Sequence, residues 1–523
     1  MVERDDSAIE TPPRTIGGIL RRLGPGLIIA GTIVGSGELI ATTKTGAQAG
    51  FWLLWLIIIG CVIKLFAQVE FGRYAISSGK TTMAAMNEVP GPRWRVNWLL
   101  WYWLVMFTAS MAQLGGIVGG VGQSLSMSVP LTGDFNRLLE EQDVWDREAK
   151  PLKEQWRHEH AAVSSANSYA ANKETAERAT DYAAASLGPR PDRSTKDDTI
   201  WAAIVTAITV VLLVNGRYGL VQNVATVLVV AFTGLTIANL CALQTHAEWA
   251  IGTTDIRNGL SFRLPPIVEG LTRSPLATAL ATFGIIGVGA TELISYPYWC
   301  IEKGYARFTG PRDDSPEWAE RARGWLRVMR WDATISMFVF TFATIAFYLL
   351  GAAVLHREGL DPSGNQMIRA LGQMYVPVFG EWAAWLFLFG AFAVLYSTFF
   401  IANAGHARVS SDALRVFGVG AHTEARRRWW VRAFCVIFPT SNLIVYIFVR
   451  APAQLVLLSG VMQAIMLPML GAATLYFRHR KCDPRIMPGR LWDLALWISV
   501  AGLLIAGGWV ALTRIFPALE QWG

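Results

Sequence analysis

The sequence predicts an all-α polytopic membrane protein, and three observations support this fold class. Of the 523 residues, 53% are hydrophobic and only 16% are charged, whereas soluble domains carry about 25% charged residues. The apolar residues gather in eleven stretches, each close to the roughly 20 residues that a helix needs to cross a bilayer. A motif of small residues followed by a carboxylate occurs inside two of these stretches, about half the chain apart.

The eleven expected spans follow one another with short loops between most of them. They lie near residues 24–49, 51–77, 95–128, 199–215, 218–244, 276–303, 328–355, 378–407, 430–449, 453–477 and 491–514. The resulting division of the chain is an N-terminal tail over 1–23, spans 1 to 3 within 24–130, a polar insert over 131–197, spans 4 to 11 within 198–514, and a C-terminal tail over 515–523.

Positive charge is concentrated in the loops after the second, sixth, eighth and tenth spans. Cytoplasmic loops of membrane proteins carry an excess of Lys and Arg. We therefore expect these loops and the N-terminus in the cytoplasm and, because the span count is odd, the C-terminus outside the cell membrane. The net charge of +7 lies in short loops rather than on one face, so nucleic-acid binding is not expected.

The insert at residues 131–197 is polar, rich in alanine and dense in both signs of charge. We expect it on the outer face as a small helical hairpin, with amphipathic helices near 134–160 and 162–186. The triplet His158-Glu159-His160 contains residue types that bind metals, but residues two apart on a helix point in different directions. We therefore prefer the interpretation that these residues belong to a solvated loop.

The repeated motif is Val34-Gly35-Ser36-Gly37-Glu38-Leu39-Ile40 in span 1 and Val288-Gly289-Ala290-Thr291-Glu292-Leu293-Ile294 in span 6. A charged side chain deep in a bilayer costs several kcal/mol and is seldom kept without a task. Glycines lower the cost of leaving helical geometry. Paired Gly-interrupted helices at matching places in two halves are typical of the binding site in transporters built from inverted repeats.

Two carboxylates and the backbone carbonyls of two breaks predict an all-oxygen site for a hard divalent cation. The candidate metal ligands are Glu38, Glu292, Gly35 and Ala290. Further candidate contacts to the ion are Ser36, Gly289 and Gln463. Simpler interpretations stay open: glycines often serve close helix packing, Gln463 can bond another helix, and a glutamate can pair with Lys44 or Lys64.

Several motifs resemble those of the Nramp family of divalent-metal transporters. They are Leu23-Gly24-Pro25-Gly26-Leu27 at the start of span 1, Gly46-Ala47-Gln48 at its end, Gly289-Ala290-Thr291 in span 6, Tyr396-Ser397-Thr398 in span 8 and Leu467-Pro468 in span 10. This resemblance covers most of the chain outside the insert. It implies the LeuT-type fold of the APC superfamily, which has five plus five helices in inverted repeats, with an eleventh helix appended.

The departures from the family pattern point to a divergent branch, similar to the Nramp-related magnesium transporters. The family's Asp-Pro-Gly-Asn motif falls on Gly35-Ser36-Gly37-Glu38, and its soft methionine ligand falls on Leu293. The positions of its proton route hold Ser110, Gln113 and Ser295, which carry no proton at physiological pH. The resemblance with these changes implies a wider cavity at Gly35 and Leu293, hard oxygen ligands, and weak or no proton coupling.

The leading hypothesis is therefore a membrane transporter for divalent metal cations, Mg²⁺ or Mn²⁺, that works by alternating access around the broken helices 1 and 6. The alternative on the same fold is a cation-coupled symporter of a small organic solute such as an amino acid. A membrane sensor or scaffold using the insert is a third candidate. No enzyme motif is present, no cofactor is expected, and the expected partners are the metal ion and the lipid bilayer, with the oligomeric state open and a monomer included.

Overall fold

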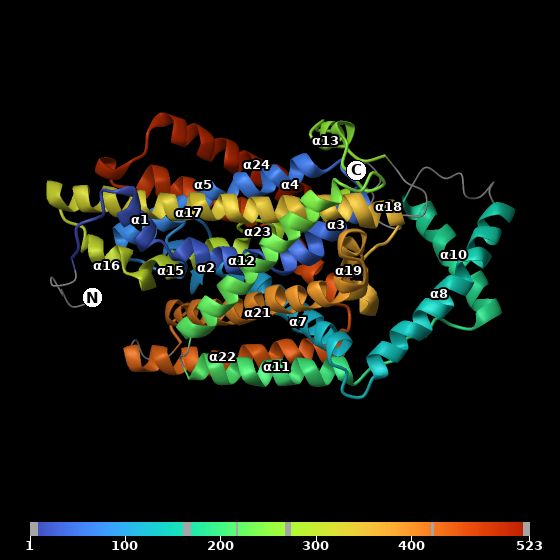
Figure 1. Ribbon diagram of the computed structural model, residues 1–523. Coiled ribbons are helices and arrows are strands. Elements are labelled where there is room, and N and C mark those ends of the chain that lie inside the picture. Colours follow the sequence, from blue (N-terminus) through green and yellow to red (C-terminus); the bar gives the residue numbers. More distant parts are fainter. Residues whose placement is uncertain (1–8, 161–168, 216–217, 267–273, 420–422, 516–523) are drawn as a thin grey trace.

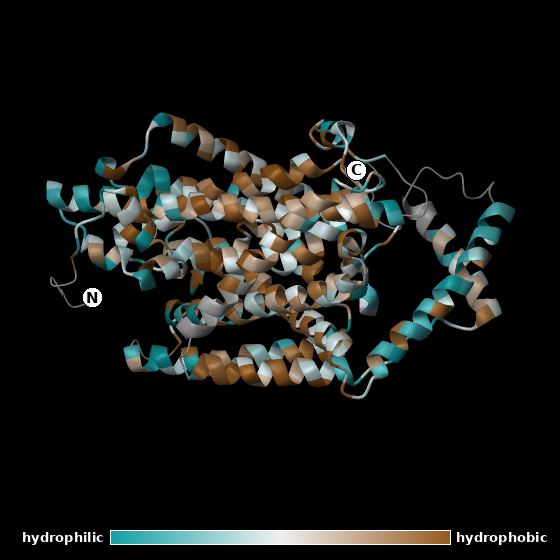
Figure 2. Ribbon diagram, viewed as in Figure 1, coloured by the Kyte–Doolittle hydropathy of each residue, from teal (hydrophilic) through white to brown (hydrophobic). Residues whose placement is uncertain are grey.

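The computed structural model describes residues 9–160, 169–215, 218–266, 274–419 and 423–515. Long helices lie side by side in an elongated bundle, with α1 at one end and the helices α8 and α10 extending beyond the other (Figure 1). Hydrophobic residues dominate the middle of the bundle, and hydrophilic residues gather at its two ends and on the extending helices (Figure 2). This distribution is that of a protein whose middle lies in lipid.

The part of the chain before residue 270 forms the first set of elements. Their bounds are α1 (Ile16–Arg22), α2 (Pro25–Ile33), η2 (Gly37–Thr42), α3 (Thr43–Ala49), α4 (Leu54–Val62), α5 (Lys64–Ser78), α6 (Thr82–Met86), β1 (Arg93–Trp94), β2 (Val96–Asn97), α7 (Trp98–Ser128), α8 (Asp134–Glu159), α10 (Tyr169–Leu187), α11 (Asp197–Val214), α12 (Tyr218–Leu243) and α13 (Thr253–Gly259). The strands β1 and β2 form one short antiparallel pair.

The remaining part of the chain forms the second set. Its bounds are α14 (Pro275–Ile285), α15 (Ala290–Lys303), α16 (Tyr305–Thr309), α17 (Pro316–Leu350), η3 (Gly351–Leu355), α18 (His356–Glu358), η4 (Gly364–Gln366), α19 (Met367–Gly372), η5 (Gln373–Tyr375), α20 (Val376–Phe379), η6 (Gly380–Trp382), α21 (Ala383–Val416), α22 (Glu424–Phe448), α23 (Pro452–Tyr476), η7 (Phe477–Lys481), η8 (Pro484–Ile486) and α24 (Arg490–Ile515).

Within the described residues, nine helices are long and apolar enough to cross a membrane, and the pair α1–α2, bent by 58°, makes a tenth by the same measure. The stretch expected as span 5 is occupied by α12. Two helices extend clearly beyond their expected bounds: α17 begins at Pro316 rather than near residue 328, and α21 ends at Val416 rather than near residue 407. The Ser315 hydroxyl accepts from Trp318 N at 3.1 Å and caps the start of α17. The first turns of this helix are polar, and the expected bounds missed them because they were set by the apolar residues alone.

The four positively charged loops lie together at the end of the bundle that holds α1. Glu88, in the loop after α6, contacts Lys80 at 2.5 Å and Lys481 at 3.5 Å, which joins the loop after span 2 to the loop after span 10. Arg312 contacts Asp483 at 3.0 Å, and the Thr81 hydroxyl donates to Asp412 at 2.5 Å. These contacts place the arginine-rich loops at one end. Their cytoplasmic location stays a prediction.

The described part of the insert contains the helices α8 and α10, close to the expected positions (Figure 1). The expected start of the second helix, near residue 162, lies outside the described residues. At the base of α8, Asp197 accepts from the backbone N–H groups of Thr132 at 2.6 Å and Gly133 at 2.8 Å, while Asp134 accepts from Lys196 N at 2.6 Å. Partial burial opposes ionisation of Asp134, but the backbone donors outweigh it and lower the pKa of this carboxyl. These reciprocal caps therefore hold the two ends of the insert beside each other.

One consequence of the loop contacts can be tested at Asp483. Its carboxylate accepts from Arg485 at 2.9 Å and pairs with Arg312 at 3.0 Å, and the Arg485 hydrogen bond is the main cause that lowers its pKa from 3.8 to about 2. Because the folded pKa is depressed, the stabilisation is complete above about pH 4 and is lost as the pH falls towards 2. We expect Asp483→Asn to lower the free energy of unfolding by about 1–2 kcal/mol at pH 7.

Thermal unfolding of the detergent-solubilised protein measures this effect. Asp192→Asn, at an exposed position in the insert, is the matched control and should leave the unfolding temperature unchanged. The difference between the wild type and Asp483→Asn should shrink as the pH is lowered from about 4 towards 2. A difference that stays constant over this range would contradict the ion-pair explanation.

Candidate functional site

Both expected helix breaks are present. In span 1, α2 ends at Ile33, and a π-helix, η2, begins at Gly37; π-helical turns are frequent at functional sites. In span 6, α14 ends at Ile285 and α15 begins at Ala290. Gly287 lies between them with φ of +55°, a left-handed conformation that side chains other than glycine disfavour. The small residues of the repeated motif therefore do interrupt the two helices.

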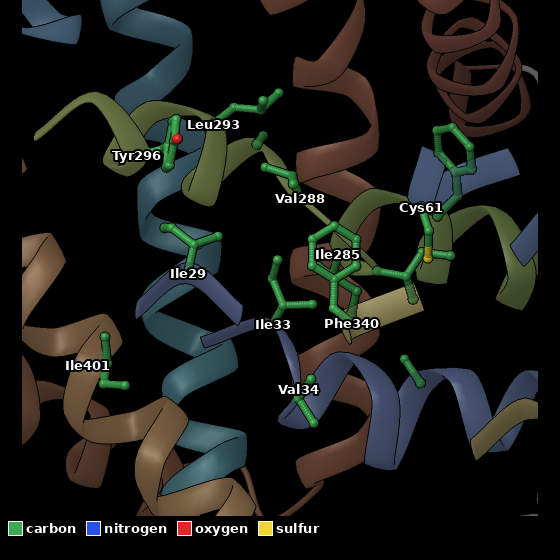
Figure 3. Close-up of a cluster of buried hydrophobic side chains, with 14 of the residues drawn as sticks. Ile29, Ile33, Val34, Cys61, Ile285, Val288, Leu293, Tyr296, Phe340 and Ile401 are labelled. Atoms are coloured by element: carbon green, nitrogen blue, oxygen red, sulfur yellow. The ribbon is translucent and has the colours of Figure 1, made fainter. Parts of the chain in front are cut away.

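The two breaks face each other inside the bundle. A methyl group added at Gly37 would lie 3.4 Å from the carbonyl oxygen of Ile285. Figure 3 shows Ile33 and Val34 from one break and Ile285 and Val288 from the other in one cluster of buried apolar side chains. The site is thus a small polar region enclosed by hydrophobic side chains.

Glu38 lies at the start of the π-helix and has no solvent exposure. Its Oε1 accepts from the Thr344 hydroxyl of α17 at 3.1 Å, and its Oε2 accepts from Gly35 N at 3.4 Å. The Glu38 carboxylate therefore accepts hydrogen bonds from α17 and from the backbone of its own break. Lys44, which the sequence offered as a possible partner of a glutamate, instead pairs with Asp361.

Gly35 has the packing role that stayed open for the glycines of the repeated motif. A Cβ atom at this position would lie 1.8 Å from the Thr398 hydroxyl oxygen of α21. The Gly35 carbonyl accepts from Leu39 N at 2.9 Å, as in a regular helix. The expectation of a wider cavity at Gly35 is therefore wrong, because the Thr398 side chain fills the space. Leu293, after the opposite break, is fully buried.

Glu292 lies in the first turn of α15 beside two other polar groups. The Thr291 hydroxyl is 3.0 Å from Glu292 Oε2 and 2.8 Å from Gln463 Oε1, and Thr291 N donates to the same Gln463 oxygen at 3.2 Å. A Cβ atom at Gly289 would lie within 2.8 Å of both the Glu292 and the Gln463 side chain. Gln463 therefore caps α15, and Gly289 leaves room for it next to Ala290, the first residue of the helix.

A chain of hydrogen bonds joins the two breaks through spans 3 and 10. Gln113 Nε2 donates to the Ser36 hydroxyl at 3.1 Å, and Gln113 Oε1 accepts from Gln463 Nε2 at 3.1 Å and from Ser459 at 2.8 Å. Gln463 continues the chain to Thr291. Of the former proton-route positions, Gln113 thus belongs to the site.

The other two former proton-route positions do not take part in this chain. The Ser110 hydroxyl donates to Met106 O at 3.2 Å, and the Ser295 hydroxyl donates to Thr291 O at 2.7 Å. Each bond stays within its own helix. Hydroxyl groups that donate to the turn before them satisfy their own polarity and offer no titratable group to a proton route.

Lys64, which the sequence offered as a possible partner of a glutamate, is fully buried at the start of α5. Its ammonium group donates to the carbonyl oxygens of Phe283 and Ile286, the latter at 2.8 Å, and lies 4.6 Å from the centre of the Phe283 ring. These carbonyls end α14 at the break in span 6. The chain's own lysine therefore binds carbonyl oxygens that were expected to be available to the transported ion.

A small cavity opens beside Glu292 on the side facing the arginine-rich loops. Its volume is about 20 Å³, room for roughly one water molecule. It is lined by residues of α2, α15 and α21, among them Thr32, Glu292, Ser295, Gly405 and His406. Glu292 is partly exposed there, whereas Glu38 is not among the lining residues.

His406 is a residue that sequence reasoning missed. It is 6% exposed, and its Nδ1 has no hydrogen-bond partner within the described part of the chain. Its ring packs edge-on against Phe107, with 5.2 Å between ring centres. An isolated histidine within the apolar span at 378–407 was the available signal, since ionisable residues inside membrane spans usually mark a pathway.

The donor set of the site is mainly oxygen. No group of three or more His, Cys, Asp and Glu side chains lies close enough to hold a metal ion among the residues that the structure describes. A cation bound here would rely on one or both carboxylates together with amide, hydroxyl and backbone oxygens, which suit hard ions. Glu38 and Glu292 follow the two facing breaks, and Lys64 donates to the carbonyl groups of the second break.

The packing of Gly35 against Thr398 generates a testable prediction. We expect Gly35→Ala to lower the free energy of unfolding by about 1–3 kcal/mol, because overpacking forces the Thr398 side chain or the backbone to move. Gly508→Ala is the matched control, since a Cβ atom in that helical position meets nothing within 4 Å. Thermal unfolding in detergent measures both variants.

The same contact predicts a rescue. The double variant Gly35→Ala with Thr398→Ala should recover most of the lost stability, because the second change removes the hydroxyl that the new methyl group meets. Equal losses in the single and the double variant would show that Thr398 is not the obstacle.

Comparison with known proteins places these observations in context. Residues 195–513 match the model of the family described as Nramp, natural resistance-associated macrophage protein-like. An uncharacterised protein of Pasteurella multocida (strain Pm70) is 20% identical over 486 residues, which cover 92% of this chain and 89% of that protein. The matched family range begins near the end of the insert, so it leaves out spans 1 to 3, where Glu38 and Gln113 lie.

Solved structures confirm the fold class. A crystal structure of a manganese transporter from Eremococcus coleocola, in a mutant form, aligns with a TM-score of 0.60 at 16% identity, over 95% of this chain and 88% of that one. The same transporter in complex with an aromatic bis-isothiourea-substituted compound gives 0.59 at 16% identity, over 97% and 89%. The predicted all-α polytopic membrane architecture of the LeuT type, with its eleventh helix, is therefore confirmed.

Proposed function

The chain belongs to the Nramp family, and from this premise we propose that it moves a divalent metal cation across the membrane with Glu38 and Glu292 as the charged ligands. The observation that carries the proposal is the position of these two carboxylates at facing helix breaks inside the bundle. The hydrogen-bond chain through Gln113 and Gln463 supports it, because it couples one break to the other.

The chemistry of the site favours a hard ion such as Mg²⁺ or Mn²⁺. Carboxylate, amide, hydroxyl and carbonyl oxygens surround the breaks, and the position of the family's thioether ligand holds Leu293. Soft ligands select softer transition metals, whereas oxygen ligands suit Mg²⁺ and Mn²⁺. The solved relatives are described as manganese transporters, which agrees with an oxygen-binding divalent cation as cargo.

Alternating access would use α2 as the moving element at the arginine-rich end. This helix is short, is bent by 58° from α1, and ends at the break before η2. Asp332 of α17 holds its start, accepting from Gly24 N at 2.8 Å and Gly26 N at 2.5 Å. Release of these bonds would free α2 to swing away from α15 and α21 and to widen the cavity beside Glu292.

The symporter alternative has less support. A solute with a carboxylate would need the N-terminus of a half-helix, as in transporters of that class. Here Gln463 caps the start of α15, and Glu292 would repel a second carboxylate.

The first functional prediction concerns the two carboxylates. Glu38→Gln and Glu292→Gln should each weaken binding of Mn²⁺ and Mg²⁺ by about tenfold or more, because each removes a negative charge from a low-dielectric site. Isothermal titration calorimetry on purified protein measures affinity, and uptake into proteoliposomes measures flux. Glu154→Gln, on the exposed face of α8, is the control and should behave as the wild type.

An amino-acid panel in the same calorimeter separates the two hypotheses. Heat from glycine or alanine with no response to either divalent cation would favour the symporter and reject metal transport. Metal binding that survives in both glutamine variants would place the ion elsewhere in the bundle.

The second functional prediction concerns protons. We propose that ion entry is not coupled to proton influx, since the former proton-route positions hold Ser110, Gln113 and Ser295. Proteoliposomes loaded with a pH-sensitive dye should show Mn²⁺ uptake without acidification of the lumen. Proton influx at a fixed ratio to Mn²⁺ would contradict this, and its loss in His406→Gln would then identify the cavity histidine as the carrier.

A further inference from the structure

The break in span 6 already contains a cation supplied by the chain. The Lys64 ammonium group donates to the carbonyl oxygens of Phe283 and Ile286 and lies over the Phe283 ring. In a broken membrane helix, freed carbonyls are the groups that coordinate a transported or coupled cation. Lys64 therefore occupies part of the carbonyl cage that the break creates.

Lys64 is held firmly at this position. It has no solvent exposure, and it follows Ile63 at the joint between α4 and α5, where the Ser499 hydroxyl of α24 donates to Ile63 O at 2.5 Å. A buried ammonium group in a membrane is expensive unless carbonyls or opposite charges surround it. Here the two carbonyls accept from two of its three N–H donors, and the Phe283 ring lies 4.6 Å away. Glu38 and Glu292 follow the two facing breaks, the second of which holds Lys64.

The sum of these charges matters for a divalent ion. Two ionised carboxylates carry −2, which would balance one divalent cation, but the lysine reduces the total to −1. A divalent cation at the carboxylates would then leave the region with a net charge of +1. Coulomb energy falls only as the inverse of distance and is large where the dielectric constant is low. The Lys64 ammonium group therefore makes binding of the divalent cation less favourable even without direct contact.

We propose that Lys64 is a tethered cation that weakens binding of the divalent ion at Glu38 and Glu292 and so sets the affinity of the site. This inference rests on the proposed function, since it assumes that these carboxylates bind the ion. A weaker site releases its cargo more easily, which a transporter needs and a storage site does not. Lys64 is thus a residue that determines affinity, not a ligand.

The test compares three substitutions that separate charge from structure. Lys64→Gln keeps N–H donors for the two carbonyls but removes the charge, Lys64→Met removes both, and Lys64→Arg keeps the charge. The charge account predicts that Mn²⁺ binds about tenfold or more tightly to the Gln and Met variants, whereas the Arg variant stays within about twofold of the wild type. Lys44→Gln is the matched control, because Lys44 is neutralised by Asp361, and its Kd should not change.

Titration calorimetry with Mn²⁺ and with Mg²⁺ on the purified full chain, recovered as a monodisperse peak, gives these affinities. A purely structural role for Lys64 predicts the opposite order, with weaker binding in the Gln and Met variants. Suppose that the wild type binds Mn²⁺ and that Glu292→Gln weakens this binding, but Lys64→Gln binds Mn²⁺ no more tightly than the wild type. This result would overturn the role of Lys64 and leave the proposed function standing. Absence of binding in the wild type and in every variant would overturn the proposed function and the inference with it.

A second comparison covers the case in which the single variants do not fold. Glu292→Gln brings the total charge of the region to zero, and adding Lys64→Gln returns it to the wild-type value of −1. The double variant should therefore bind Mn²⁺ about tenfold more tightly than Glu292→Gln. Equal or weaker binding in the double variant would reject the tethered cation.

Discussion

The whole arrangement depends on keeping three charges, Glu38, Glu292 and Lys64, inside a bundle whose surroundings are apolar. Such charges persist in membrane proteins only when polar partners replace water. Here the partners are a threonine of α17 for Glu38, the neighbouring threonine of α15 for Glu292, and the carbonyl groups that end α14 for Lys64. The helix breaks are therefore inseparable from the charges, because an intact helix would have no free carbonyls to offer.

Glycines have two roles in this structure: they permit a helix break, and they permit close helix packing. Gly287 adopts a left-handed conformation that makes the break in span 6 possible. Gly35 instead permits contact with Thr398, and Gly284 lets α14 approach the Gly460 carbonyl of α23, where an added Cβ atom would lie 1.9 Å from the oxygen. A glycine-rich break thus serves close packing as much as unwinding, in line with the general role of glycine between membrane helices.

Two neutral amides, Gln113 and Gln463, connect the two repeats, and Gln113 lies at a position of the family's proton route. Gln113 bonds to Ser36 at one break and to Gln463 near the other. An amide keeps the same hydrogen bonds at every physiological pH, whereas a carboxylate would change them on protonation. The hydrogen bonds between these two amides are therefore independent of pH. His406, in the cavity beside Glu292, is a titratable group outside this connection.

The sequence by itself determined the membrane class, the approximate spans, the helical insert and the two interrupted helices, because apolar length, charge and glycine content act locally. It also singled out Glu38, Glu292, Ser36 and Gln463 as candidate contacts to an ion, but it left open whether the two glutamates share one site. Only the tertiary structure decided that Thr398 fills the space at Gly35, that Lys64 binds the carbonyls of span 6, and that His406 lines the cavity beside Glu292. These contacts join residues more than two hundred positions apart in the chain or on different spans, and the hydrophobic pattern of one span carries no information about which side chain of another span it meets.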